Sequence, residues 1–83
     1  MARPARGGAR LAVVSFAAHA RRVRDPGLPL RHRVSALRSC VVVHGPFGHH
    51  GTLAFLELEA GPFHRDERAL LRAPAVLEDL RAR

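Results

Sequence analysis

The chain contains a single cysteine, Cys40, in 83 residues. One thiol cannot form a disulfide within one chain, which excludes a disulfide-stapled scaffold. A chain this short buries only about 60% of its unfolded surface when it folds, so its stability is marginal without such a staple. The length therefore predicts one small domain.

Lysine is absent altogether, as are asparagine, glutamine, isoleucine, tyrosine and tryptophan. A Walker phosphate loop requires a lysine, so the Gly-rich segment from Gly45 to Thr52 does not predict nucleotide hydrolysis. Proteins that bind single-stranded nucleic acid commonly add aromatic side chains on which bases stack. Of the four phenylalanines, Phe16 alone lies among the N-terminal arginines, which argues against sequence-specific readout.

Long apolar runs are missing as well. The longest mostly apolar segment is residues 11–20, LAVVSFAAHA. It has half of the roughly 20 residues that a helix needs to cross a bilayer. We therefore expect no transmembrane segment.

The N-terminal residues allow more than one interpretation. Residues 1–10 combine proline, glycine and three arginines, which predicts a flexible basic arm. Residues 11–24 form either a leader peptide or the first element of the domain. The apolar segment resembles a secretory signal, but Arg21 and Arg22 follow it at once. Six arginines and no acid in residues 1–24 fit a mitochondrial presequence better, so we favour a cytoplasmic or mitochondrial location over secretion.

The net charge of +7 is concentrated in the N-terminal half. Residues 1–40 contain nine arginines and one acid, whereas residues 41–83 contain five arginines and six acids. Arginine pairs with phosphate through two hydrogen bonds, so this half predicts an anionic partner, either RNA or an acidic protein surface. GC-rich codons also supply arginine, so composition alone does not establish binding. The predicted binding residues are Arg21, Arg22, Arg24, Arg31, Arg33 and Arg38.

The clearest break in the chain is residues 25–29, DPGLP. Two prolines around a glycine stop both helices and strands, which predicts a linker. A small α+β domain is expected over residues 30–83. Leu30, Val34 and Leu37 recur at helical spacing and predict a short basic amphipathic helix, with an extended segment as the alternative.

The middle of the predicted domain resembles a β-hairpin. Residues 41–43 are three valines, whose β-branched side chains favour an extended backbone. The glycines and proline of residues 44–51 then predict a turn. Residues 52–60 fit either a strand or a helix capped by Thr52. We favour the strand, because it completes a hairpin.

The last twenty residues predict C-terminal helices packed across this hairpin. Asp66 and Glu67 early in the segment and Arg72 later in it suit the helix dipole. Pro74 divides the segment into two helical pieces. The predicted fold is therefore a small single α+β domain with a central β-hairpin, C-terminal helices and a mobile basic N-terminal arm.

Six histidines and one cysteine raise the question of a metal site. The spacing of Cys40, His44, His49, His50 and His64 matches no known zinc-binding pattern. Cys40 stands beside three valines, where burial favours an unreactive thiol, and no nucleophile motif is present. We predict no catalytic residues, no metal site and no cofactor.

The leading hypothesis is a non-catalytic, small basic binding or accessory protein that engages RNA or an acidic protein through its N-terminal arginines. The alternative is a mitochondrially imported microprotein that acts as a structural or assembly subunit. Removal of a leader near residues 20–25 would favour the alternative. The sequence leaves the oligomeric state open.

Overall fold

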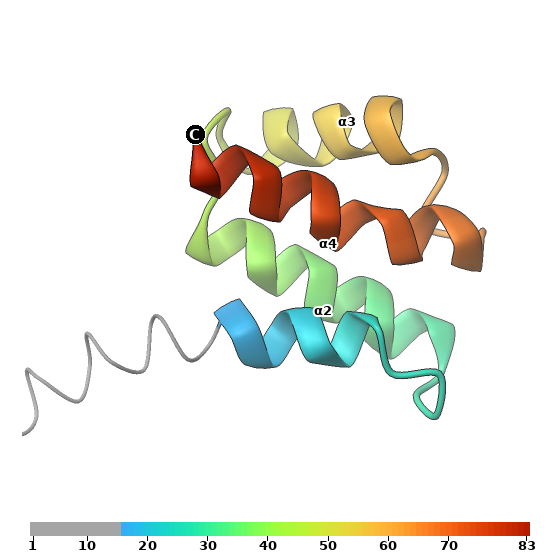
Figure 1. Ribbon diagram of the computed structural model, residues 1–83. Coiled ribbons are helices and arrows are strands. Elements are labelled where there is room, and N and C mark those ends of the chain that lie inside the picture. Colours follow the sequence, from blue (N-terminus) through green and yellow to red (C-terminus); the bar gives the residue numbers. More distant parts are fainter. Residues whose placement is uncertain (1–15) are drawn as a thin grey trace, which may run out of the picture.

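The computed structural model describes residues 16–83, and these residues form a bundle of helices (Figure 1). Residues 16–23 are helical and are called helix 16–23 here. Three longer helices follow, namely α2 (Leu30–Val43), α3 (His49–Ala60) and α4 (Glu67–Ala82). The described residues contain no β-strand, so the predicted α+β fold with a central β-hairpin is wrong. The predicted arm, residues 1–10, lies outside the described residues.

Helix α4 lies between α2 and α3 and contacts both, and helix 16–23 lies on the side of the bundle away from α3 (Figure 1). All four helices contribute apolar side chains to one core. Its largest members, each at most 2% exposed, are Phe16, Val23, Leu37, Val41, Leu56, Phe63, Leu70 and Leu77. Burial of each such side chain contributes about 1.5–3 kcal/mol, so this core is the main source of stability. No helix within residues 16–83 is both long and apolar enough to cross a lipid bilayer.

Helix α2 continues through Val41, Val42 and Val43, where the sequence predicted a strand. Valine disfavours a helix by less than about 1 kcal/mol relative to alanine. Val41 is only 2% exposed and extends the buried stripe of Val34 and Leu37 at helical spacing. The free energy gained by burying this side chain exceeds its local preference for a strand.

Residues 52–60 belong to α3, so the predicted second strand is also wrong and the helical alternative is correct. Thr52, Leu56 and Ala60 are its buried residues, and their spacing of four is helical. The helix begins at His49, ahead of Thr52, so this threonine is not its cap. Its hydroxyl instead accepts the backbone N–H of Phe47 at 3.0 Å and ties the preceding loop to the helix.

The sequence Gly-Pro-Phe occurs at residues 45–47 and again at residues 61–63, and each copy follows a helix. Proline disfavours the helical conformation of the residue before it. A Cβ atom on Gly45 would lie 2.7 Å from the carbonyl oxygen of Val41, so a larger residue does not fit there. Gly61 has a φ angle of 105°, which residues with a Cβ rarely adopt. Both copies of Gly-Pro-Phe therefore follow the end of a helix, where the sequence predicted the end of a strand.

Helix α4 is continuous across Pro74, where the sequence predicted two separate pieces. A proline inside a helix removes one hydrogen bond and costs about 3 kcal/mol. Leu70 and Leu77, on either side of it, are fully buried, and their packing offsets this cost. Asp66 caps the start of the helix, because its carboxylate accepts the backbone N–H of Arg68 at 3.0 Å.

Candidate anion-binding groove

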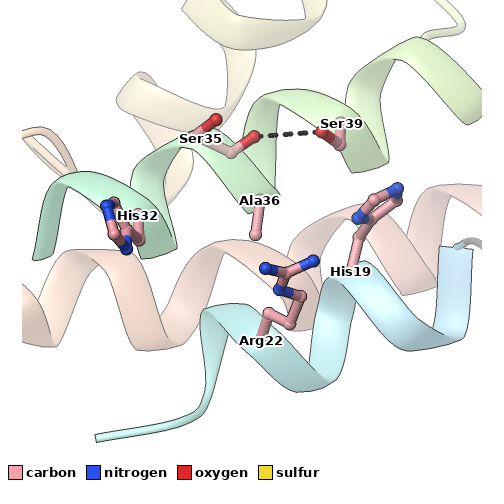
Figure 2. A pocket seen from close by; sticks show the side chains of 6 residues that line it. All are labelled: His19, Arg22, His32, Ser35, Ala36 and Ser39. Carbon is pink, nitrogen blue, oxygen red and sulfur yellow. Dashed lines mark hydrogen bonds between the residues drawn. The ribbon is translucent and has the colours of Figure 1, made fainter. Parts of the chain in front are cut away.

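A groove of about 270 Å³ lies between helix 16–23 and α2. Figure 2 shows the six residues that line it. These are His19 and Arg22 from helix 16–23 and His32, Ser35, Ala36 and Ser39 from α2. The guanidinium of Arg22 points toward α2 and, in this view, lies between the two imidazole rings (Figure 2). Five of the six lining residues are basic or polar, so the groove is chemically distinct from the core.

The helical repeat explains why these side chains share one groove. His19 and Arg22 are three residues apart and lie on one face of helix 16–23. Phe16, Ala20 and Val23 form the buried face, and the groove residues lie beside that face. On α2 the lining residues are likewise spaced by three or four, and the short side chain of the single alanine leaves room opposite the guanidinium (Figure 2).

The basic side chains of the groove are available to a ligand. Among residues 16–83, no hydrogen bond or ion pair involves the side chain of His19, Arg22 or His32. The hydroxyl of Ser39 donates to the backbone carbonyl of Ser35 at 3.2 Å, within α2 itself. Hydrogen bonds from charged donors to phosphate oxygens are roughly twice as strong as those between neutral groups. The arrangement therefore suits an anion.

Five of the six predicted binding arginines are exposed, and four of these, Arg21, Arg22, Arg31 and Arg38, form no ion pair within residues 16–83. Arg31 and Arg38 are seven residues apart on one face of α2, which places their Cα atoms about 10.5 Å apart. Arg21 and Arg22 border an open depression together with Arg24 and Asp25. We use the name basic face for the exposed or half-buried, unpaired basic side chains of helix 16–23 and α2 as a set, and it consists of His19, Arg21, Arg22, Arg31, His32 and Arg38.

The other two predicted residues, Arg24 and Arg33, bind within the chain. Arg33 is only 3% exposed; its Nε donates to the carbonyl oxygen of Val23 at 2.8 Å. A terminal nitrogen of Arg33 also donates to Glu67 at 3.0 Å. Arg24 donates two hydrogen bonds, of 2.8 and 3.1 Å, to the carboxylate of Glu78. Both arginines connect the end of helix 16–23 to α4, and Arg33 is buried whereas Arg24 is partly exposed.

The Arg24–Glu78 pair changes the ionisation of both groups. The hydrogen bond from Arg24 holds the pKa of the Glu78 carboxyl below its ordinary value. The same hydrogen bond raises the pKa of the Arg24 guanidinium above its ordinary value. The two side chains are 39% and 43% exposed, so water screens the pair and its contribution to stability is below about 1 kcal/mol.

Cys40 lies in the core and is not a candidate nucleophile. Burial raises the pKa of its thiol to about 11, which keeps it protonated at neutral pH. Its Sγ lies 4.0 Å from the carbonyl oxygen of Phe16. In the part of the chain that the structure describes, no three histidine, cysteine or acidic side chains are grouped to hold a metal ion.

Helix 16–23 is an integral part of the core. Phe16 and Ala20 are each 2% exposed, and Val23 is fully buried. The guanidinium of Arg81 lies 3.9 Å from the centroid of the Phe16 ring, which joins α4 to this helix. Removal of a leader near residues 20–25, which would favour the imported-subunit hypothesis, would take Phe16 out of the core. Residues 11–15 of the predicted leader lie outside the described residues.

The sequence analysis did not identify four groove residues, namely His19, His32, Ser35 and Ser39. A local signal existed, because a spacing of three or four places residues on one face of a helix. That signal does not show which face of α2 lies opposite Arg22. The packing of helix 16–23 against α2 decides which face of α2 lies opposite Arg22. This packing is a property of the tertiary structure.

Comparison of the chain with protein-family models, with curated proteins and with solved structures gives no match. The features of this protein that bear on its function are therefore the exposed basic side chains of the basic face.

Proposed function

We propose that this protein is a non-catalytic binding protein that engages RNA through phosphate contacts on the basic face. The observation that carries the proposal is the exposure of Arg21, Arg22, Arg31 and Arg38 on two adjacent helices. None of them has a carboxylate partner within residues 16–83. A guanidinium donates two parallel hydrogen bonds to one phosphate group, and such contacts require no particular base sequence.

The uneven distribution of charge between the helices supports this proposal. Residues 16–43 contain six arginines and one acid, Asp25, whose carboxylate accepts the N–H of Gly27 at 2.9 Å. Helix α3 contains Glu57 and Glu59 and no arginine. Because α3 lies on the far side of α4 from helix 16–23, positive charge is concentrated on one side of the bundle (Figure 1). A polyanion is attracted to that side.

A phosphate backbone fits the basic face better than an acidic protein surface does. The centre of an interface between two proteins is usually apolar, with aromatic residues enriched. The exposed large apolar side chains in residues 16–83 are Val42, Val43, Phe47, Leu58 and Leu71. Of these, Val42 alone continues the stripe of exposed arginines on α2, one turn beyond Arg38. Phosphate contacts depend on charge and N–H donors, which the basic face does supply.

The test is the affinity of the full chain for a labelled oligouridylate of about ten nucleotides, measured by fluorescence anisotropy between about 50 and 200 mM salt. The logarithm of the affinity should fall with the logarithm of the salt concentration, by about 0.7 for each phosphate contacted. The R31Q/R38Q variant should bind more weakly, with a slope that is shallower by about 1.4.

The matched control is R65Q/R68Q, since Arg65 and Arg68 are exposed and lie outside the basic face. Both double variants lower the net charge from +7 to +5. The control should bind more tightly than R31Q/R38Q. Equal losses in the two variants would show that binding depends on overall charge, which contradicts the proposed face. Absence of RNA binding, or preference for polyglutamate over RNA, would overturn the proposal.

A further inference from the structure

We propose that the groove between helix 16–23 and α2 holds one phosphate group of the bound RNA. Arg22 holds this phosphate together with the imidazoles of His19 and His32. This inference rests on the proposed function and specifies which residues form the phosphate site.

The geometry places three basic side chains around one space. Arg22 reaches from helix 16–23 toward α2, with His19 and His32 on either side of it in this view (Figure 2). A water molecule occupies about 30 Å³ in the liquid, so a groove of about 270 Å³ has room for a phosphate group and part of its ribose. Arg22 provides paired donors for the phosphate, and the imidazoles are placed to add one N–H donor each.

The groups that face the groove carry no negative charge. Helix 16–23 contributes His19 and Arg22, and α2 contributes His32 together with two serine hydroxyls and an alanine methyl group. The one carboxylate in residues 16–43, Asp25, is held in the connecting loop by the N–H of Gly27. No carboxylate among the lining residues can therefore compete with a bound phosphate for these donors.

The experiment measures oligouridylate binding at pH 8 and at one salt concentration. The H19A/H32A variant should bind about threefold more weakly than the wild-type chain, because it removes the two imidazoles that line the groove. The H49A/H50A variant should bind like the wild type, because it removes two exposed histidines at the start of α3.

A second comparison uses single arginine variants and does not depend on the histidine substitutions. At pH 8, R22Q should weaken binding about threefold more than R65Q, although both remove one exposed charge. Equal effects of R22Q and R65Q, or wild-type affinity in folded H19A/H32A, would overturn the groove inference while RNA binding itself persists. Loss of RNA binding by the wild-type chain would overturn the proposed function as well.

Discussion

The Nε–H of Arg33 donates to the carbonyl oxygen of Val23 at 2.8 Å, so a side chain of α2 caps the end of helix 16–23. Carbonyls in the last turn of a helix have no donor within that helix. Arg72 of α4 does the same for α3, because two of its nitrogens donate to the carbonyl oxygen of Ala60 at 3.1 and 2.7 Å. Each cation also lies at the negative end of a helix dipole. Each of the two arginines thus connects its own helix to the helix that precedes it in the chain.

Arg33→Met should lower the free energy of unfolding by about 2–3 kcal/mol. The variant keeps an apolar stem but leaves the Val23 carbonyl without its donor and Glu67 without its partner. Urea unfolding followed by far-UV circular dichroism measures this change. Arg31→Met is the control, because Arg31 is exposed on the same helix, and its cost should stay within about 0.5 kcal/mol. Similar costs for the two variants would contradict the structural role of Arg33.

Phe16→Ala should destabilise the fold by about 3–4 kcal/mol, because this side chain is 2% exposed and packs in the core. A domain of this size has little stability in reserve, so the variant should melt at a much lower temperature. Phe47→Ala is the matched control, because Phe47 is 52% exposed, and its cost should be about 1 kcal/mol. If Phe16→Ala melted like the wild type, helix 16–23 would be dispensable, as a removable leader must be.

Glu78→Gln should cost less than about 1 kcal/mol at neutral pH and nothing in strong acid. The pKa of Glu78 is lowered in the folded state by its hydrogen bond from Arg24, so the stabilising contribution is complete above the ordinary carboxyl pKa. It is lost as the pH falls through the lowered value, where the carboxylate of the folded protein takes up a proton. Melting temperatures of the two proteins should therefore differ at pH 7 and converge near about pH 2–3. An equal difference in melting temperature at both pH values would contradict this linkage. Glu59→Gln serves as the control, because Glu59 is exposed on α3.

The thiol of Cys40 should react slowly with a disulfide reagent in native buffer and rapidly in denaturant. Cys40 is fully buried, and burial raises the pKa of its thiol to about 11. Only the thiolate reacts, so the native rate should still rise about tenfold per pH unit between pH 8 and pH 9. Absorbance of the released reagent measures the rate. Complete labelling of the native protein within the time needed for the denatured protein would show that the core opens readily.

The sequence identified the boundaries of the elements better than it identified their type. The linker at residues 25–29 separates two helices, and the Gly-Pro pairs at residues 45–46 and 61–62 end two others. Residues 41–43 and 52–60 lie between these breaks and were predicted to be strands. The three valines and the mixed apolar and polar residues 52–60 fit a strand as well as a helix. Local preferences for helix or strand differ by less than about 1 kcal/mol per residue, so packing decides between them.

The charge of the candidate binding surface was predictable from the sequence, but the residues that belong to it were not. The excess of arginine in the N-terminal half was visible from counting residues, and Arg31 and Arg38 are exposed as that prediction requires. Arg24 and Arg33 belong to the same excess, yet they bind Glu78 and Glu67 from α4. Their acidic partners lie 54 and 34 residues away in the chain, so no local sequence pattern predicts these ion pairs.

The sequence by itself determined the breaks at residues 25–29, 45–46 and 61–62, which half of the protein is positively charged and that no disulfide forms within one chain. These properties follow from the chemistry of single residues and their immediate neighbours. The tertiary structure decided which residues of the same type are buried and which are exposed. Phe47 and Phe63 follow the same Gly-Pro pair, but Phe47 is 52% exposed and Phe63 is fully buried. The reason is that the burial of a side chain depends on which helix faces contact one another. The packing of α4 against α2 and α3 determines those contacts.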